Sequence, residues 1–119
     1  MKFCWSTLTV KDLDASLDFY QNIIGLDLNR RFSAGPDTEI AFLGNAETKI
    51  ELICNKGNQA INAGEDISWG FETESLDRVI ALLSEKSIAF TGPFQPGPQV
   101  RFVYIKDPNG MKIQLVQNL

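Results

Sequence analysis

A short tetrapeptide occurs twice in this chain, and its spacing constrains the fold more than any other feature of the sequence. Lys49-Ile50-Glu51-Leu52 returns, nearly unchanged, as Lys112-Ile113-Gln114-Leu115 sixty-three positions later. The same offset relates Leu13-Asp14 to Leu76-Asp77. Because one offset holds for both a strand-like and a helix-like segment, the sequence predicts a duplicated structural unit.

Composition limits both the size of the protein and its partners. With 119 residues, 44% of them hydrophobic, we expect a single domain, 1–119, with modules at 1–54 and 67–119. The sequence has no apolar run typical of a signal peptide or membrane span, which predicts a cytoplasmic protein without a membrane partner. A net charge of −4 and no cluster of basic residues argue against a nucleic-acid partner and favour a neutral or cationic small molecule.

The sequence contains no histidine, which removes the commonest metal ligand and the usual proton shuttle at neutral pH. Catalytic Ser-His and Cys-His arrangements are therefore excluded. The two cysteines, Cys4 and Cys54, lack metal-binding or redox spacing, so we expect buried structural thiols.

Alternation and helical spacing predict the same order of elements in both halves. The first half reads as strand 3–10, helix 12–24 and strands 27–33, 38–44 and 48–54, followed by a polar linker at 55–66. The second half reads as strand 67–73, helix 75–87, a short strand near 88–91 and strands 100–106 and 111–117. Residues 91–98 contain three prolines and read as an irregular loop at the rim of a pocket. The predicted fold class is α+β, with two tandem βαβββ modules.

Local signals mark where these elements begin and end. Asp12 and Ser75 are the predicted N-caps of the two helices, and Gly25 is the predicted stop of the first. The segment Asp107-Pro108-Asn109-Gly110 predicts a type I turn in the last hairpin.

One helix covers only one face of each predicted four-stranded sheet, so each module keeps an open face. The period of two places Trp5 and Thr7, then Glu51, then Ser68 and Gln114 on these open faces. The two faces either line a shared cleft or are simply solvated, since half-buried antiparallel sheets show the same pattern.

The helix entry Val10-Lys11-Asp12-Leu13 through Phe19-Tyr20, and the hairpin Asp107-Pro108-Asn109-Gly110 leading into Lys112-Ile113-Gln114-Leu115, resemble the vicinal oxygen chelate superfamily. That superfamily includes glyoxalase I, bleomycin-resistance proteins and extradiol dioxygenases. The resemblance covers essentially the whole chain and implies paired βαβββ modules whose curled mixed sheets form a cleft, often in a homodimer.

The resemblance also implies a divalent metal held by one residue on each of four strands, commonly two histidines and two glutamates. Carried over position by position, these ligands fall on Trp5, Glu51, Ser68 and Gln114, so only one carboxylate is retained. An indole, a hydroxyl and an amide do not replace the missing donors. We therefore expect no metal and no other cofactor.

Two functions remain open. The first is a metal-free binding protein that sequesters an aromatic or cationic small molecule in the cleft; the second is a glyoxalase-like lyase or isomerase in which Glu51 acts in acid–base chemistry. The candidate ligand-binding residues are Trp5, Thr7, Glu51, Ser68, Arg101, Tyr104 and Gln114.

Each candidate has an alternative role. Trp5 either stacks on a ligand or fills the space of the lost metal. Glu51 either pairs with a ligand or is neutralised by Lys49 or Lys112. The sequence does not settle whether Arg101 and Tyr104 face the cleft.

Overall fold

The computed structural model describes all residues from 1 to 119. They form two compact units, Met1–Ala63 and Gly64–Leu119, and the boundary falls inside the predicted linker at 55–66. That the two units make up one domain stays a prediction. None of the helices is both long enough and apolar enough to cross a membrane.

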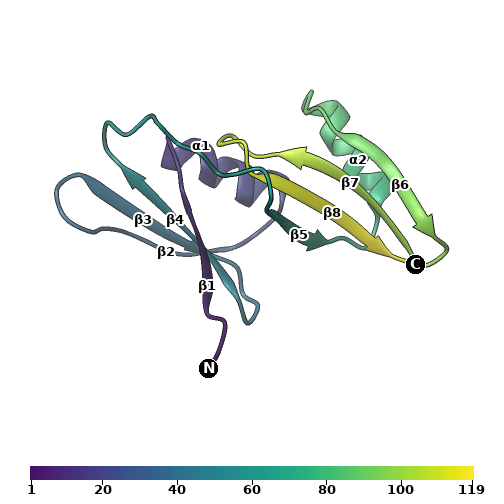
Figure 1. Ribbon diagram of the computed structural model, residues 1–119, viewed down its shortest axis with the longest axis horizontal. Helices are drawn as coiled ribbons and strands as arrows, with labels where there is room; N and C mark the ends of the chain where they lie inside the picture. The colour runs from purple at the N-terminus through teal and green to yellow at the C-terminus, as the bar shows by residue number, and fades with distance from the viewer. The chain divides into compact units, whose positions relative to one another are not determined.

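The first unit is one mixed sheet with helical segments between its first two strands (Figure 1). Its elements are β1 (Trp5–Thr9), α1 (Leu13–Asp18), the π-helical turn η1 (Phe19–Ile23), β2 (Leu28–Ser33), β3 (Thr38–Leu43) and β4 (Lys49–Asn55). The strand order is β1-β4-β3-β2. The β1–β4 pair is parallel and the other pairs are antiparallel.

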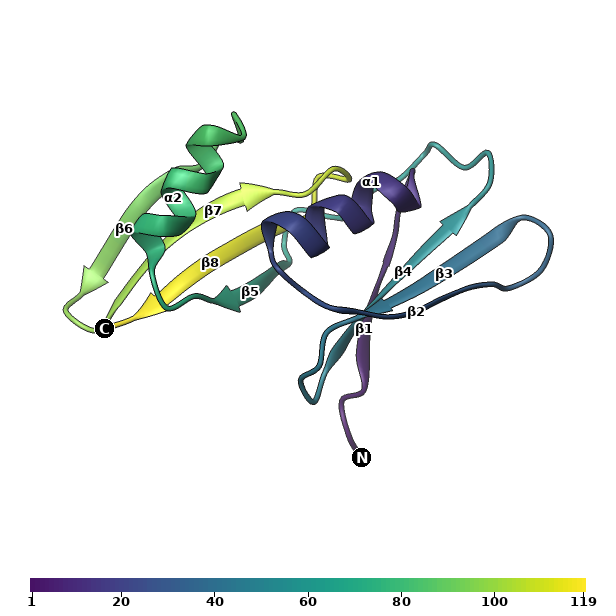
Figure 2. The ribbon, with the colours of Figure 1, turned by 180° about the vertical axis from the view of Figure 1, so that it is seen from behind.

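The second unit repeats this arrangement, as Figure 2 shows for β5 to β8 and α2. Its elements are β5 (Ser68–Glu72), α2 (Leu76–Glu85), β6 (Thr91–Gly97), β7 (Val100–Lys106) and β8 (Lys112–Asn118), in the strand order β5-β8-β7-β6. The parallel pairs have the same register, Trp5 opposite Lys49 and Ser68 opposite Lys112. The predicted duplication and the α+β fold class are confirmed.

Both helices begin where the sequence predicts, because each predicted N-cap side chain accepts a backbone hydrogen bond. Asp12 Oδ1 accepts from the Ala15 amide at 3.1 Å, and Ser75 Oγ accepts from the Arg78 amide at 3.3 Å. The predicted single helix at 12–24 is in fact α1 followed by η1. Gly25, the predicted stop, has a φ of 85°, a conformation that glycine adopts without strain.

The core of each unit lies between its helix and the helix-facing side of its sheet. The fully or almost fully buried apolar residues include Leu8, Val10, Leu17, Leu43 and Leu52 in the first unit, and Leu76, Leu83, Val103, Ile113 and Leu115 in the second. The predicted buried thiols are wrong for Cys4, which is exposed, while Cys54 is only partly exposed. Cys4 precedes β1 and is therefore not held against the core.

The proline-rich segment predicted as an irregular loop at 91–98 is instead the edge strand β6, and the predicted strand near 88–91 is wrong. Proline has no N–H to donate, so it is tolerated on an edge strand, where one side needs no partner. The pairing with β7 is interrupted by shifts between Thr91, Phe94 and Gly97. Alternation could not reveal such a bulged strand.

The hairpin between β7 and β8 forms the predicted type of turn. The Gly110 amide donates to the Asp107 carbonyl at 3.1 Å. The Asp107 side chain is buried and its Oδ1 accepts from the amides of Asn109 and Met111 at 2.7 and 2.8 Å. These hydrogen bonds explain why the motif has an aspartate at the first position of the turn, because its side chain holds the backbone of the turn in place.

Candidate functional site

The open face of the first sheet brings together residues from all four of its strands. In the β1–β4 pair Trp5 lies opposite Lys49 and Thr7 opposite Glu51. Phe42 of β3 is the antiparallel partner of Glu51. The structure therefore confirms that Trp5, Thr7 and Glu51 share the open face, because side chains of paired residues point to the same side of a sheet.

Aromatic rings form a cluster on this face. The rings of Trp5 and Phe42 meet edge to face at a centroid distance of 5.3 Å, and Phe32 stacks on Phe42 at 6.4 Å. The guanidinium carbon of Arg30 lies 4.8 Å from the Phe42 centroid and 5.1 Å from that of Phe32. Packing covers Phe42 almost completely, whereas Trp5 stays 47% exposed, so the indole presents a free surface.

A pocket of about 740 Å³ opens beside this cluster. Its lining residues come from the N-terminal segment, β1, β2, β3, the loop between β3 and β4, and the start of β4: Lys2, Phe3, Cys4, Trp5, Asn29, Arg30, Phe42, Glu47 and Lys49. We call it the aromatic pocket. Its volume lies within the range of small-molecule sites.

The carboxylate of Glu51 accepts a hydrogen bond from the Thr7 hydroxyl at 2.7 Å. Within the first unit Lys49 does not form an ion pair with it, since the ion pairs of that unit belong to Arg31. That a lysine neutralises Glu51 stays a hypothesis from the sequence. Glu51 lies next to the aromatic pocket but is not among its lining residues.

The open face of the second sheet holds three more predicted residues. Ser68 and Gln114 lie on it by alternation, and Tyr104 is the direct partner of Gln114. The Gln114 Nε2 donates to the Tyr104 hydroxyl at 3.5 Å, and the Lys112 ammonium lies 4.4 Å from the Tyr104 ring centroid. Tyr104 thus faces the open side, which the sequence left undecided.

Arg101 does not belong to this group. It lies on the opposite face of β7, where its guanidinium pairs with Asp77 of α2 at 3.3 Å. Odd-numbered residues of β7 share the helix side with the buried Val103 and Ile105. The structure thus places Arg101 in the contact between sheet and helix and away from the other candidate ligand-binding residues.

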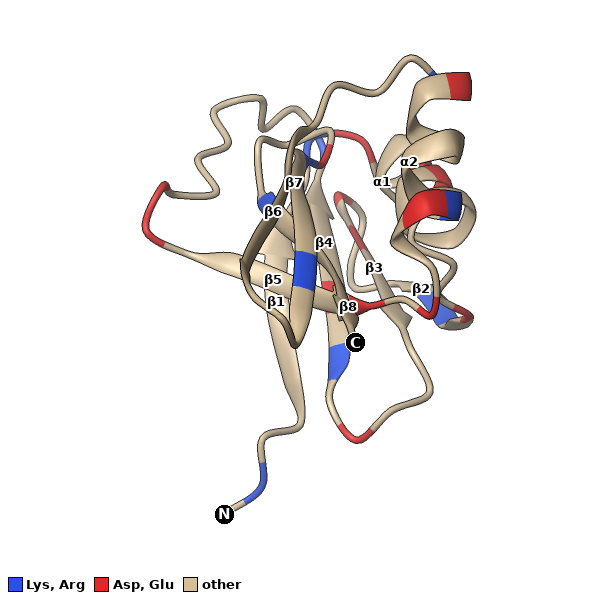
Figure 3. Ribbon diagram, turned by 90° about the vertical axis from the view of Figure 1, so that its right-hand side faces the viewer, with Lys and Arg blue, Asp and Glu red and all other residues tan.

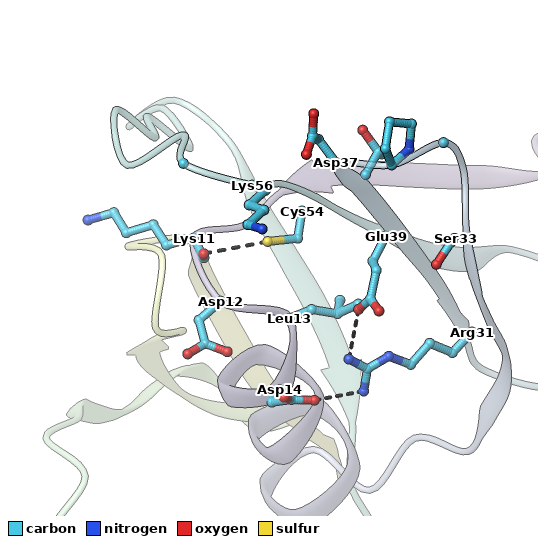
Figure 4. A pocket seen from close by; sticks show the side chains of 14 residues that line it. Lys11, Asp12, Leu13, Asp14, Arg31, Ser33, Asp37, Glu39, Cys54 and Lys56 are labelled. Carbon is cyan, nitrogen blue, oxygen red and sulfur yellow. Dashed lines mark hydrogen bonds and ion pairs between the residues drawn. The ribbon is translucent and has the colours of Figure 1, made fainter.

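A second pocket, of about 430 Å³, lies on the helix side of the first unit (Figure 4). Arg31 bridges Asp14 at 2.7 Å and Glu39 at 2.8 Å. The hydrogen bonds to Glu39 and Asp14 raise the pKa of the Arg31 guanidinium. Because its central charges already compensate one another, this pocket offers little to a charged ligand.

Charge is distributed unevenly over the elements (Figure 3). Acidic residues lie mostly on helices and loops, while several lysines and arginines lie on strands.

Two residues of the aromatic pocket, Arg30 and Phe42, were not predicted as site residues from the sequence. Arg30 and Phe32 are two positions apart, so alternation predicts that their side chains lie on the same face of the strand. The sequence does not say which face this is, and only the pairing of Arg30 with Phe42 of β3 shows it.

The resemblance described above implies a divalent metal held at four equivalent positions, one on each of four strands. Of the four equivalent positions only Glu51 carries an anionic donor. Trp5 packs its indole against Phe42, and the Gln114 amide faces Tyr104. Indole has no free lone pair, and one carboxylate with a hydroxyl and an amide does not make a stable transition-metal site. The residues do not fit the metal.

Known proteins resemble this chain along its whole length. The model of the Glyoxalase/Bleomycin resistance protein/Dioxygenase superfamily matches residues 3–115. A lactoylglutathione lyase of Oryza sativa is 34% identical over 97% of this chain, which spans only 44% of that protein. A probable lactoylglutathione lyase of Synechocystis is 33% identical over 92% of this chain and 90% of its own length.

Solved structures share the fold. The trypanothione-dependent glyoxalase I of Leishmania major superposes with a TM-score of 0.84 at 23% identity, covering 98% of this chain and 86% of that one. The antibiotic-binding protein TnmS3 from Streptomyces superposes with a TM-score of 0.77 at 24% identity, covering 100% of this chain and 97% of that one. Together with the repeated βαβββ units, the match to the family model shows that this chain belongs to the glyoxalase/bleomycin resistance protein/dioxygenase superfamily.

Proposed function

We propose that this protein binds a small, planar organic molecule on the open face of its first sheet, with Trp5 as the main contact surface. The observation that carries the proposal is the aromatic pocket, in which an exposed indole lies beside Phe42 and Arg30. Indole offers the largest stacking surface of any side chain, and such contacts are strongest when they exclude water. Structural similarity to an antibiotic-binding protein is compatible with this function.

Tryptophan fluorescence tests the proposal directly. The chain contains two tryptophans, and Trp69 lies on the helix side of β5, opposite Ile113 of the buried core. A planar aromatic ligand should therefore quench Trp5 and leave Trp69 unaffected. We expect Trp69→Phe to retain the quench and Trp5→Phe to abolish it.

A set of planar aromatic molecules of positive, negative and zero charge serves as the probe. The proposal fails if no member quenches Trp5 or raises the melting temperature, since a ligand that binds only the native state must stabilise it. If the ligand is a cation held by Glu51, as the sequence predicts, Glu51→Gln should weaken its binding.

A second candidate function is a glyoxalase-like lyase or isomerase with Glu51 as its general base. The names of the relatives favour this candidate over binding alone, because both curated proteins described above are lactoylglutathione lyases or probable ones. Glu51 is the retained carboxylate on the open face of the first sheet, and the hydrogen bond from Thr7 orients it. The lost metal ligands count against it.

Incubation with lactoylglutathione in D₂O separates the two candidates. A lyase or isomerase that removes a proton next to the carbonyl incorporates deuterium there or consumes the compound, and Glu51→Gln should abolish either change. NMR detects both outcomes. If lactoylglutathione binds without deuterium uptake or turnover, the binding function stands and the lyase or isomerase function is excluded.

We further propose that the protein binds no divalent transition metal specifically, because the donor set does not fit one. Elemental analysis after dialysis measures this. Near-stoichiometric metal, accompanied by a rise in melting temperature on adding Zn²⁺ or Ni²⁺, would contradict the proposal.

We also propose a homodimer, because each sheet has one face that its own helix does not cover. Light scattering at micromolar concentration measures the mass. A monomeric mass would exclude this assembly. Cytoplasmic residence and the absence of a nucleic-acid partner stay predictions from the sequence.

A further inference from the structure

We infer that the aromatic pocket selects an organic anion, specifically a planar aromatic carboxylate, and not the cationic molecule that the sequence predicts. The inference rests on the proposed function, because it names the ligand class of the same pocket. Its starting point is the charge of the lining. Lys2, Arg30 and Lys49 are basic and only Glu47 is acidic, although the whole chain carries a net charge of −4.

The charge of Arg30 is not compensated within the chain. The three ion pairs of the structure join Arg31 to Asp14 and Glu39, and Arg101 to Asp77. Arg30 instead lies over two aromatic rings, at 4.8 and 5.1 Å from their centroids. Stacking holds a guanidinium in place without using its N–H donors, whose planar fork matches a carboxylate.

Lys49 adds a second positive charge to the aromatic pocket, on the side of Phe42 opposite to Arg30. It begins β4, whereas Arg30 belongs to β2, and these two strands flank β3 with Phe42 between them. Lys49 is also the direct partner of Trp5 in the parallel pair. A ring that stacks on Trp5 therefore lies in a positive field, and a local excess of one charge favours ligands of the opposite sign.

The negative charge of Glu51, which lies closest to Phe42 in the strand register, does not cancel the positive charge of the pocket lining. Glu51 is the partner of Phe42, but it lies outside the lining of the pocket and its carboxylate is engaged by Thr7. A ligand carboxylate directed at Arg30 and Lys49 does not have to approach it. For an anionic ligand, Glu51→Gln should leave the affinity unchanged or increase it.

Three probes with the same ring test the charge preference: 2-naphthoate, 2-naphthamide and 2-naphthylmethylammonium. In the Trp69→Phe protein, Trp5 reports their binding by fluorescence. We expect naphthoate to bind about tenfold more tightly than the neutral amide, and the ammonium to bind most weakly, because one charge-assisted hydrogen bond is worth about this factor.

Variants of Arg30 locate the effect. Arg30→Gln should weaken naphthoate about tenfold and leave naphthamide nearly unchanged. Arg30→Lys, which keeps the charge and loses the planar fork, should weaken naphthoate less. Calorimetric titration of each variant measures the affinities, and the melting temperature checks that the fold is intact.

Lys56→Gln is the matched control, because it removes the same unit of charge from the helix-side pocket. It should leave the affinity for naphthoate unchanged. Equal affinity for all three probes, a preference for the ammonium, or equal losses in Arg30→Gln and Lys56→Gln would overturn the inference and leave the proposed function standing. If no probe quenches Trp5, both fail.

Discussion

The two units have the same topology and the same parallel register, but their open faces carry different chemistry. At three equivalent positions the larger or charged member belongs to the first unit: Trp5 against Ser68, Thr7 against Gly70, and Glu51 against Gln114. On the helix side, apolar residues occupy equivalent positions in both units. Packing therefore constrains one side of the repeat and leaves the other free to diverge toward function.

Both open faces also contain a basic side chain over aromatic rings, but the kind of cation differs. On the first unit Arg30 lies over Phe32 and Phe42, and on the second unit Lys112 lies over Tyr104. Guanidinium presents a planar fork of donors, while an ammonium is a point charge. The first unit is thus the better suited to recognise a carboxylate, as inferred above.

The largest expected effect tests whether the helix sides of the two units are equally important. Leu52 and its repeat equivalent Leu115 are buried, at 0% and 5% exposure. Each change to alanine should lower the free energy of unfolding by about 2–5 kcal/mol, because it removes apolar contacts and leaves a cavity. Urea denaturation measures both. A loss below about 1 kcal/mol in only one variant would break the equivalence of the two cores.

The N-caps test the repeat at its helix starts. Asp12→Ala and Ser75→Ala should each destabilise the protein by about 1 kcal/mol, because one amide of the first turn loses its side-chain acceptor. Asparagine at either position keeps an acceptor and is the control. Unchanged stability in an alanine variant would mean that this cap contributes nothing, contrary to the geometry.

The ion pairs of Arg31 and Arg101 should contribute less to stability, and unequally. Arg31 contacts two carboxylates, whereas Arg101 contacts one at the longer distance of 3.3 Å. We expect a loss of about 0.5–1 kcal/mol for Arg31→Gln and at most about 0.5 kcal/mol for Arg101→Gln, because solvent screens the exposed acidic partners. Thermal unfolding at low and high salt measures this. A larger loss for Arg101→Gln would reverse the comparison.

The smallest expected effect concerns Gly70, which stands where the first unit has Thr7. A Cβ added at Gly70 would meet Gln114 Oε1 at an ordinary contact distance of 3.6 Å. Gly70→Ala should therefore raise stability by about 0.5 kcal/mol, because alanine restricts the unfolded chain more than glycine does. Denaturant titration checks the sign. A clear destabilisation would mean that the second open face does need a glycine here.

Much of the fold could be predicted from the sequence because the informative signals were local or repeated. Alternation placed Trp5, Thr7 and Glu51 on one face, and short-range capping placed both helix starts. The edge strand β6 was missed, because its prolines and interrupted pairing remove the pattern on which strand prediction depends. The sequence left the facing of Arg101 and Tyr104 open, and the structure places Arg101 on the helix side of β7 together with the buried Val103.

By itself the sequence determined the duplication and, apart from β6 and η1, the order of elements, since these depend on residue identity and spacing along the chain. That three of four metal-ligand positions carry other residues followed from the resemblance to the superfamily. Only the tertiary structure decided that Arg30 of β2, Phe42 of β3 and Trp5 of β1 line one pocket with an excess of positive charge. Their association depends on the register between strands, which is fixed by hydrogen bonds between residues far apart in the sequence and by the shift between Leu28 and Arg30. No pattern within a single strand contains that information.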